Sequence, residues 1–228
     1  SVIEIPSQSK VFDWTVAKEW SPKEAWLIDP NGKKRAIFSQ NNLNLVSHSI
    51  PVNKEMDLSD LLPHIYSLPD QPDVIPYVTS YYKESWGFCM SDNERRSLPE
   101  GKYQIYIDSK LNIGSMSLAE VLLPGESKEE ILISTYICHP SMANDNLSGV
   151  VVSVGLYKTI SQLKNRKYSY RFLFVPETIG SLAWLAYQNE NEVQERTKAG
   201  VVLSCIGNDG PFTWKRSRHG NSIIDRVV

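Results

Sequence analysis

A histidine and an aspartate six residues apart are the residues of this sequence best suited to bind a cation. His139 comes at the end of the apolar run Glu130–Cys138, and Asp145 lies in the polar loop that follows it. A continuous apolar run of this length is typical of a strand that is buried on both faces. Because zinc accepts imidazole nitrogen and carboxylate oxygen as ligands, we predict a zinc site that contains His139 and Asp145.

Each of these two residues also has a simpler structural role open to it. A lone histidine after an apolar strand is more often a packed or solvated side chain than a ligand. Asp145 precedes the apolar segment Leu147–Leu163, so its carboxylate can instead cap the amino terminus of a helix. The two roles of Asp145 are compatible, because one carboxylate oxygen can face the metal while the other caps the helix.

Short strand-like runs alternate with helix-like segments from Gly125 onward. Such alternation predicts βαβ units, and hence an α/β fold with a mostly parallel sheet flanked by helices. Ligands bind at the carboxyl edge of such sheets, which is where His139 is expected. The strands are expected at Glu130–Cys138, Tyr168–Val175 and Ala199–Ile206, and the helices at Leu147–Leu163 and Ser181–Glu195.

The part of the chain before this region has a different pattern of strand-like runs and turns. Between residues 18 and 108 the strand-like runs are short and separated by turn residues. The turn Asp29–Gly32 (D-P-N-G), flanked by A-W-L-I and R-A-I-F, predicts a β-hairpin. We therefore predict a small β-rich subdomain at 18–108, inserted into an α/β core that consists of 1–17 and 109–228.

The overall composition excludes some classes of partner. The chain has 228 residues, 41% of them hydrophobic, and a formal net charge of −2. This balance gives no electrostatic footprint for nucleic acid or a membrane surface, and no apolar run is long enough to span a bilayer. The three cysteines form no C-x-x-C pair, which favours a reducing cytoplasm. The expected partner is a small molecule or a peptide, and a homo-oligomer is left open.

Motifs on either side of His139 extend the pattern. The strand, the histidine, the D-N-L-S-G element at 145–149 and the following helix resemble the co-catalytic zinc aminopeptidases. The segment R-F-L-F-V-P-E-T-I-G-S at 171–181 resembles the next strand of that family. In the family the histidine binds one zinc ion and the aspartate bridges two. The resemblance implies these roles for His139 and Asp145.

A closer resemblance covers nearly the whole chain. Five motifs occur in order: V-F-D-W-T-V-A-K-E-W, I-P-Y-V-T-S-Y-Y, W-G-F-C, C-H-P-S-M-A-N-D-N-L-S-G and P-E-T-I-G-S. Together they resemble the aminopeptidase-like proteins of bacterial polysaccharide-biosynthesis loci. The resemblance implies an aminopeptidase-type core with an inserted β-rich subdomain, and a zinc hydrolase as its function.

Two departures from the family pattern alter the expected site. The family has two adjacent glutamates, a general base and a zinc ligand, where this sequence has Pro176 and Glu177. The aspartate that binds zinc at the next strand end is replaced by Ser204, and Asp209 is close enough to substitute through a rearranged loop. The last ligating histidine is expected beyond residue 228, so we interpret the chain as incomplete at its carboxyl end. We therefore expect one metal ion, with Glu177 favoured slightly as general base over ligand.

Other residues are weaker candidates. Cys205, Asp209 and His219 follow the predicted strands and are considered for the site at lower weight. Aromatic residues of the insert are expected to form its core, with stacking against a sugar or peptide as the alternative, and its histidines are expected to be structural. These residues are Tyr77, Tyr81, Tyr82, Trp86, His48 and His64.

Three hypotheses on function follow from these residues. The leading one is a metal-dependent hydrolase that cleaves an amide bond in a peptide or in the N-acyl group of a sugar precursor. Pro176 and Ser204 favour the second, a catalytically degenerate binding or scaffold protein in polysaccharide biosynthesis. A serine or cysteine hydrolase is weaker, because no G-x-S-x-G occurs and Cys138 is expected to point away from His139 across the strand.

Overall fold

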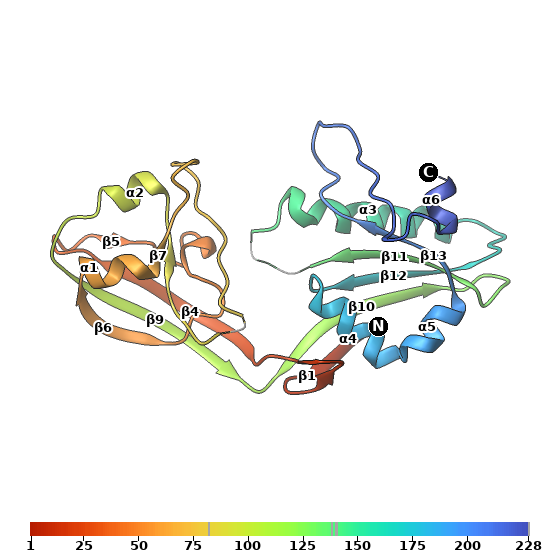
Figure 1. Cartoon of the computed structure of the whole chain (residues 1–228), viewed down its shortest axis with the longest axis horizontal. Coiled ribbons are helices and arrows are strands. Elements are labelled where there is room, and N and C mark those ends of the chain that lie inside the picture. Colours follow the sequence, from red (N-terminus) through yellow and green to blue (C-terminus); the bar gives the residue numbers. More distant parts are fainter. Residues whose placement is uncertain (82, 138, 140, 228) are drawn as a thin grey trace. The chain divides into compact units, whose positions relative to one another are not determined.

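A computed structural model describes residues 1–81, 83–137, 139 and 141–227 (Figure 1). The chain divides into two compact units, of which the first combines Ser1–Val16 with Ser115–Val228 and the second is Ala17–Gly114. Two residues named above, Tyr82 and Cys138, lie outside the described residues. Among the helices that the structure describes, none has the length and apolar character needed to cross a bilayer.

A five-stranded mixed sheet forms the centre of the first unit. Its strands are β1 (Val2–Pro6), β10 (Ser115–Leu123), β11 (Glu130–Tyr136), β12 (Ser169–Val175) and β13 (Thr197–Leu203). They lie in the order β1-β10-β12-β11-β13. β11 pairs in parallel with β12 and β13, whereas β10 is antiparallel to β1 and β12. The predicted α/β fold with flanking helices is confirmed, and the prediction of a mostly parallel sheet is wrong.

The connections between strands explain why the sheet is mixed. Helices cross over between β11 and β12 and between β12 and β13, and such crossovers bring the chain back in the same direction. In the sequence, β1 precedes the second unit and β10 follows it, and β10 leads to β11 through a connection without a helix. The alternation of strands and helices in the sequence begins only at β11, so it gave no information on the two antiparallel strands.

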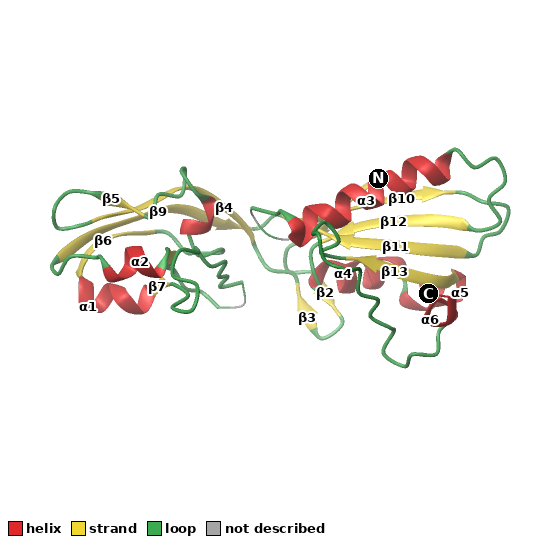
Figure 2. Ribbon diagram, turned by 90° about the horizontal axis from the view of Figure 1, so that it is seen from above, coloured by secondary structure: helices red, strands yellow, loops and turns green. Residues whose placement is uncertain are grey.

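Helices cover both faces of this sheet (Figure 2). They are α3 (Asn144–Ser161) on one face, and α4 (Ile179–Gln188) and α5 (Glu190–Arg196) on the other. Successive residues of β12 alternate between the two cores, because Phe172 packs with residues of α3 and Leu173 packs with residues of α4. The predicted single helix Ser181–Glu195 is split at Asn189, which has φ +64°. A last helix, α6, spans Ile223–Val227.

A buried cluster of charged groups joins three strands on the face covered by α4 and α5. Arg171 on β12 binds Glu130 on β11 with both Nε and Nη2, at 2.7 and 2.8 Å, and Glu120 on β10 with Nη1 at 2.9 Å. Trp184 of α4 donates its indole N–H to Glu120, at 2.9 Å. Arg171 and Glu130 are buried, and the hydrogen bonds to Glu130 raise the pKa of Arg171. Arg196 adds a second cation, with Nε 3.3 Å from Glu130, so two guanidinium groups balance the two carboxylates of this cluster.

We predict that Arg171→Met destabilises the first unit by about 3–5 kcal/mol, because buried Glu130 loses both of its hydrogen bonds to Arg171 and keeps only the longer contact with Arg196 at 3.3 Å. Urea unfolding of the purified chain measures this change. The matched control is Lys198→Ala, because Lys198 forms an exposed ion pair with Glu129 at 2.8 Å. We expect the control to leave the unfolding midpoint unchanged. Equal midpoints for the two variants would contradict the prediction.

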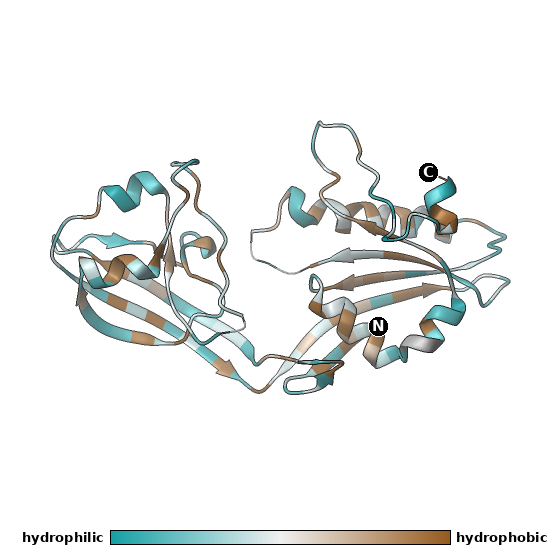
Figure 3. Ribbon diagram, in the orientation of Figure 1, coloured by the Kyte–Doolittle hydropathy of each residue, from teal (hydrophilic) through white to brown (hydrophobic). Residues whose placement is uncertain are grey.

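The second unit is built on a four-stranded antiparallel sheet. Its strands lie in the order β5-β4-β9-β6. Alternate residues of β9 face a core that contains Tyr103, Ile105 and Ile107, and Figure 3 shows the matching alternation of hydropathy along this strand. The long strands are β4 (Glu19–Ile28), β6 (Val52–Asp57) and β9 (Lys102–Asn112), and β5 is Lys34–Arg35. The short elements of this unit are 3-10 turns at Asn42–Asn44 and Leu62–His64, α1 (Leu58–Leu61), β7 (Ile65–Tyr66), β8 (Phe88–Cys89) and α2 (Asp92–Arg96).

The predicted hairpin at D-P-N-G is confirmed, since β4 and β5 pair in antiparallel on either side of it. A second hairpin, β2 (Lys10–Val11) with β3 (Trp14–Thr15), belongs to the first unit. The buried carboxylate of Asp29 holds the D-P-N-G turn by accepting backbone N–H groups of Asn31 and Lys33 at 3.0 and 2.9 Å. Burial opposes ionisation of Asp29, but these bonds and the Arg35 guanidinium outweigh it, so its pKa is lowered.

Candidate metal site at the edge of the mixed sheet

The residues that follow the parallel strands β11, β12 and β13 lie at one edge of the sheet. Tyr136 at the end of β11 pairs with Val175 at the end of β12, and Thr135 pairs with Leu203 at the end of β13. The segments that carry His139, Glu177 and Ser204 therefore leave the sheet at the same edge. Crevices at such carboxyl edges are where α/β sheets bind ligands.

His139 and Asp145 face each other at this edge. His139 Nε2 lies 3.4 Å from Asp145 Oδ2, and the exposed fractions of the two side chains are 17% and 56%. This distance is long for a hydrogen bond, which usually spans about 2.7–3.2 Å. Two ligands about 2.05 Å from a tetrahedral zinc ion are about 3.3 Å apart. The pair thus fits two corners of a zinc shell, although no third His, Cys, Asp or Glu completes a metal-binding group in the part of the chain that the structure describes.

The other oxygen of Asp145 is held by a tyrosine that the sequence reasoning missed. Tyr136 donates its hydroxyl to Asp145 Oδ1 at 2.7 Å and lies 2.8 Å from Ser204 Oγ. Because the single phenolic proton goes to the carboxylate, the serine hydroxyl is the donor in the second bond. The only sequence signal for Tyr136 was its place at the end of the predicted strand, three residues before His139.

The hydroxyl of Tyr136 and the carboxylate of Asp145 shift each other's pKa in opposite directions. The hydrogen bond from Tyr136 lowers the pKa of Asp145, and the contact with His139 lowers it further. Burial raises the pKa of Tyr136, and the charge of Asp145 adds to this. Asp145 is therefore an ionised acceptor and Tyr136 a neutral donor at neutral pH. Among the described residues, this carboxylate has side-chain hydrogen bonds with Tyr136 and His139.

The residue after Asp145 is a buried asparagine that ties together the ends of β11 and β13. The amide of Asn146 donates to Thr135 Oγ1 at 2.8 Å and to the backbone oxygens of Tyr136 and Leu203, both at 3.2 Å. Its carbonyl oxygen accepts the backbone N–H of Cys205 at 3.0 Å. The side chain is fully buried, and the peptide bond between Asp145 and Asn146 is cis. The hydrogen bonds of Asn146 therefore fix the ends of β11 and β13 next to Asp145.

Asn144, just before the D-N-L-S-G segment, and Ser148 within it hold the loop after β13. Asn144 Oδ1 accepts the N–H of Gly207 at 2.7 Å, and Ser148 Oγ accepts that of Ile206 at 3.0 Å. Gly149 allows α3 to approach closely, because a Cβ there would lie 2.5 Å from the backbone oxygen of Leu203. This part of the sequence thus fixes the loop after β13 and the position of α3, and it also supplies Asp145.

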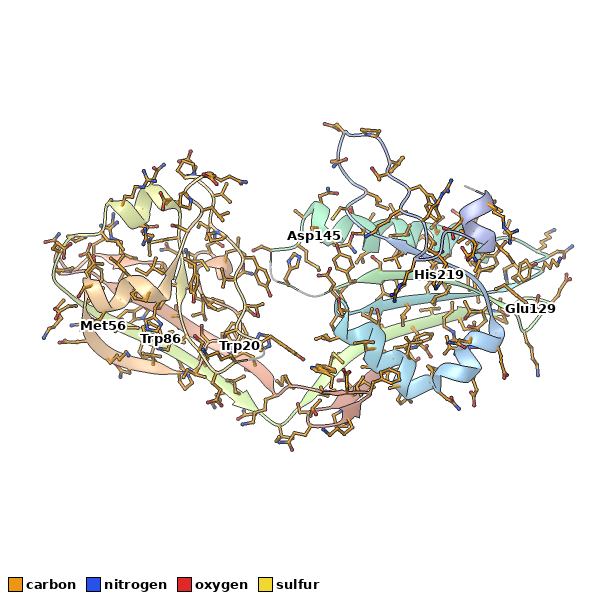
Figure 4. The ribbon with its side chains drawn as sticks, in the orientation of Figure 1. Trp20, Met56, Trp86, Glu129, Asp145 and His219 are labelled. Atoms are coloured by element: carbon orange, nitrogen blue, oxygen red, sulfur yellow. The ribbon has the colours of Figure 1, made fainter. Side chains whose placement is uncertain are left out.

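The structure brings only some of the predicted site residues together. His139, Asp145, Ser204 and Cys205 form one cluster with Tyr136, whose hydroxyl is 3.8 Å from Cys205 Sγ. Glu177 follows β12 at the same edge and is exposed. Asp209 and His219 are exposed in the segment after β13, and Figure 4 shows His219 well apart from Asp145.

The aromatic residues of the second unit divide between core and surface. Trp86 is buried and stacks on His64, with ring centroids 3.7 Å apart, as expected for structural residues. Tyr77 is 44% exposed. His48 lies between Trp20 and Tyr81, at centroid distances of 5.4 and 4.9 Å.

The fold matches that of zinc aminopeptidases. The structure of a zinc aminopeptidase from Bacillus subtilis superposes with a TM-score of 0.59 at 11% identity, over 91% of this chain and 59% of that one. A peptidase M28 precursor from Shewanella amazonensis gives a TM-score of 0.55 at 12% identity, over 88% of this chain and 60% of that one. At these identities the likeness concerns the fold alone.

The chain belongs to the family described as a domain of unknown function, DUF4910, whose model matches residues 1–228. It is 48% identical over 225 residues to a Clostridium acetobutylicum protein named "Putative polysaccharide biosynthesis protein with aminopeptidase-like domain". A crystal structure titled as a "putative peptidase" from the same organism has a TM-score of 0.94 and 46% identity over all of this chain. The chain spans 51% and 53% of these two relatives' lengths. The resemblance to aminopeptidase-like proteins of polysaccharide biosynthesis is thereby confirmed.

Two glycines of α3 test whether the site depends on the close approach of this helix to the strand ends. Gly149→Ala is expected to destabilise the chain by about 1–3 kcal/mol, because the new methyl group would overlap the backbone oxygen of Leu203 and Thr135 Oγ1. Gly155→Ala is the control on the same helix, since nothing lies within 4 Å of its added Cβ. Helix propensity should make this control neutral or more stable by up to about 1 kcal/mol. Thermal unfolding followed by circular dichroism measures both, and a Gly149→Ala variant as stable as the control would contradict the packing argument.

Proposed function

We propose that this protein is a metal-dependent hydrolase of the aminopeptidase type, which cleaves an amide bond in a peptide or in an N-acyl group of a sugar precursor. One observation carries the proposal. His139 Nε2 and Asp145 Oδ2 lie 3.4 Å apart at the carboxyl edge of a sheet whose fold is similar to that of a zinc aminopeptidase. The relative's association with polysaccharide biosynthesis supports the sugar precursor as a substrate class.

The protein's own groups divide the work as follows. His139 would hold zinc through Nε2 and Asp145 through Oδ2. Zinc, when bound, would polarise the scissile carbonyl and lower the pKa of a water molecule. The exposed carboxylate of Glu177 would accept a proton from water and return it to the leaving amine, the task of a general base and then of a general acid.

The hydrogen bonds of Asp145 favour one metal ion over two. Oδ1 already accepts the hydroxyl of Tyr136 at 2.7 Å, which leaves Oδ2 for a cation. Ser204 stands where the family has a ligating aspartate, and its hydroxyl contacts Tyr136 instead. Tyr136 is on this view a positioning residue, since it orients the carboxylate and does not touch the metal.

The second candidate function is a binding or scaffold protein that has kept the fold without the chemistry. It is favoured by the same tyrosine, because the bond from Tyr136 holds Asp145 Oδ1 in place without a metal. The lack of a third ligand among the described residues also favours it. Zinc content separates the two candidates, since only the hydrolase requires a stoichiometric metal.

We predict that the chain binds one equivalent of zinc and that His139→Ala removes it, with loss of at least tenfold in affinity. Elemental analysis after dialysis gives the stoichiometry, and competition with a chromophoric chelator gives the affinity. His219→Ala is the matched control, because this imidazole is exposed and apart from Asp145. Hydrolysis of an aminoacyl anilide and of an N-acetylated amino sugar is measured on the same samples. Zinc-free wild-type protein without activity would leave the scaffold as the function.

Tyr136→Phe tests the positioning role separately. Loss of the hydroxyl frees Asp145 Oδ1 to rotate, so zinc affinity should fall about tenfold while the fold is kept. Because His139 and Asp145 both remain, the expected loss is smaller than for His139→Ala. Unchanged zinc binding would contradict the positioning role, and tighter binding would show that Tyr136 competes with the metal.

A further inference from the structure

The second unit contains a cavity that the proposed hydrolase site does not use. Its volume is about 160 Å³, and its walls are largely apolar. It opens to solvent, since its lining combines His48 and Tyr81 with the exposed residues Lys18, Lys83 and Glu84. The cavity lies within one compact unit, so its walls belong to a single packed body. A volume of this size admits a single ring or a small side group.

One wall of the cavity is fixed by a dense set of hydrogen bonds. Trp20 donates its indole N–H to the backbone oxygen of Ser49 at 2.9 Å, and the hydroxyl of Ser109 donates to the same oxygen at 2.7 Å. Ser80, which also lines the cavity, donates its N–H and hydroxyl to the backbone oxygen of Ser47 at 2.9 and 3.1 Å. The segment that carries His48 is thus held from two sides.

His48 itself has a conformation that needs such support. Its φ is +66°, in the left-handed region that few residues other than glycine occupy. Its ring stacks on Trp20, meets Tyr81 edge to face, and places Nδ1 3.0 Å from Ser47 Oγ. Burial lowers the pKa of His48, so the imidazole is neutral at pH 7. Strained residues that the surroundings hold in place are frequent at binding sites, and this one presents a rigid aromatic wall.

The charges around the cavity favour an anion. Two lysines, Lys18 and Lys83, line the cavity against one glutamate, Glu84, and the imidazole is neutral. Neither ammonium forms an ion pair with any carboxylate of the described chain. Both therefore remain available to a charged group that enters beside the aromatic wall.

We propose that this cavity binds a small organic carboxylate with a planar apolar body, which stacks against His48 and Tyr81 and pairs with Lys18 and Lys83. The proposal does not depend on the metal site, because all these residues belong to the second unit.

Benzoate and benzamide are the test probes, since they have the same ring and nearly the same size and differ in charge. Titration of the isotope-labelled chain, followed by heteronuclear NMR, should give saturable shifts at Tyr81 and Lys83 with benzoate. Benzamide should bind at least about threefold more weakly, because it lacks the charge that the lysines attract. Equal affinities for the two probes, or no saturable shift with benzoate, would overturn the proposal.

The double variant Lys18→Gln with Lys83→Gln should weaken benzoate binding at least about threefold and leave benzamide binding unchanged. The control, Lys33→Gln with Lys102→Gln, makes the same change in net charge. Lys102 is roughly 30 Å along β9 from Leu111, which lines the cavity. His48→Asn keeps a residue that tolerates the left-handed backbone and should weaken both probes. Loss of benzoate affinity in the control, or its retention in the cavity variant, would contradict the assignment.

Discussion

The candidate site depends on one buried amide. Asn146 makes hydrogen bonds to the ends of two strands and to the loop after β13, and it does so with a fully buried side chain. Because unpaired amide groups are costly away from water, these bonds act together to define where each strand ends. Asp145 precedes Asn146 directly, so these bonds fix its backbone, and the hydrogen bond from Tyr136 then orients its carboxylate. The position of the candidate metal ligand Asp145 at this edge of the sheet therefore depends on Asn146, which is not itself a candidate ligand.

Much of the first unit could be predicted from the sequence, because its elements have clear periodicity. The apolar run before His139 is β11, and the small and apolar residues after Leu147 form α3. The antiparallel strands could not be predicted in the same way, since the pairing of β1 with β10 joins segments more than 100 residues apart. No local pattern carries such a pairing. The split of the predicted helix falls at Asn189, whose positive φ is a local conformation that asparagine adopts more readily than most residues.

The candidate site could be predicted only as far as residue types reveal it. His139 and Asp145 were visible because their types and spacing suit a metal, and the structure brings their side chains together. Tyr136 was not visible, because a tyrosine at the end of an apolar strand is ordinarily a packing residue. Its role arises from the register that sets the ends of β11 and β13 side by side. The sequence also gave no sign of the cavity beside His48, whose walls come from four separate segments.

The guanidinium of Arg171 has a consequence for how the sheet assembles. It bonds to carboxylates on both neighbouring strands, on the face covered by α4 and α5. Successive residues of a strand point to opposite faces, so a shift of β12 by one position would turn this charge into the apolar layer beneath α3. There it would have no carboxylate and no water. The ion cluster therefore selects the correct register of β12, because it makes the misaligned sheet far less stable than the correct one.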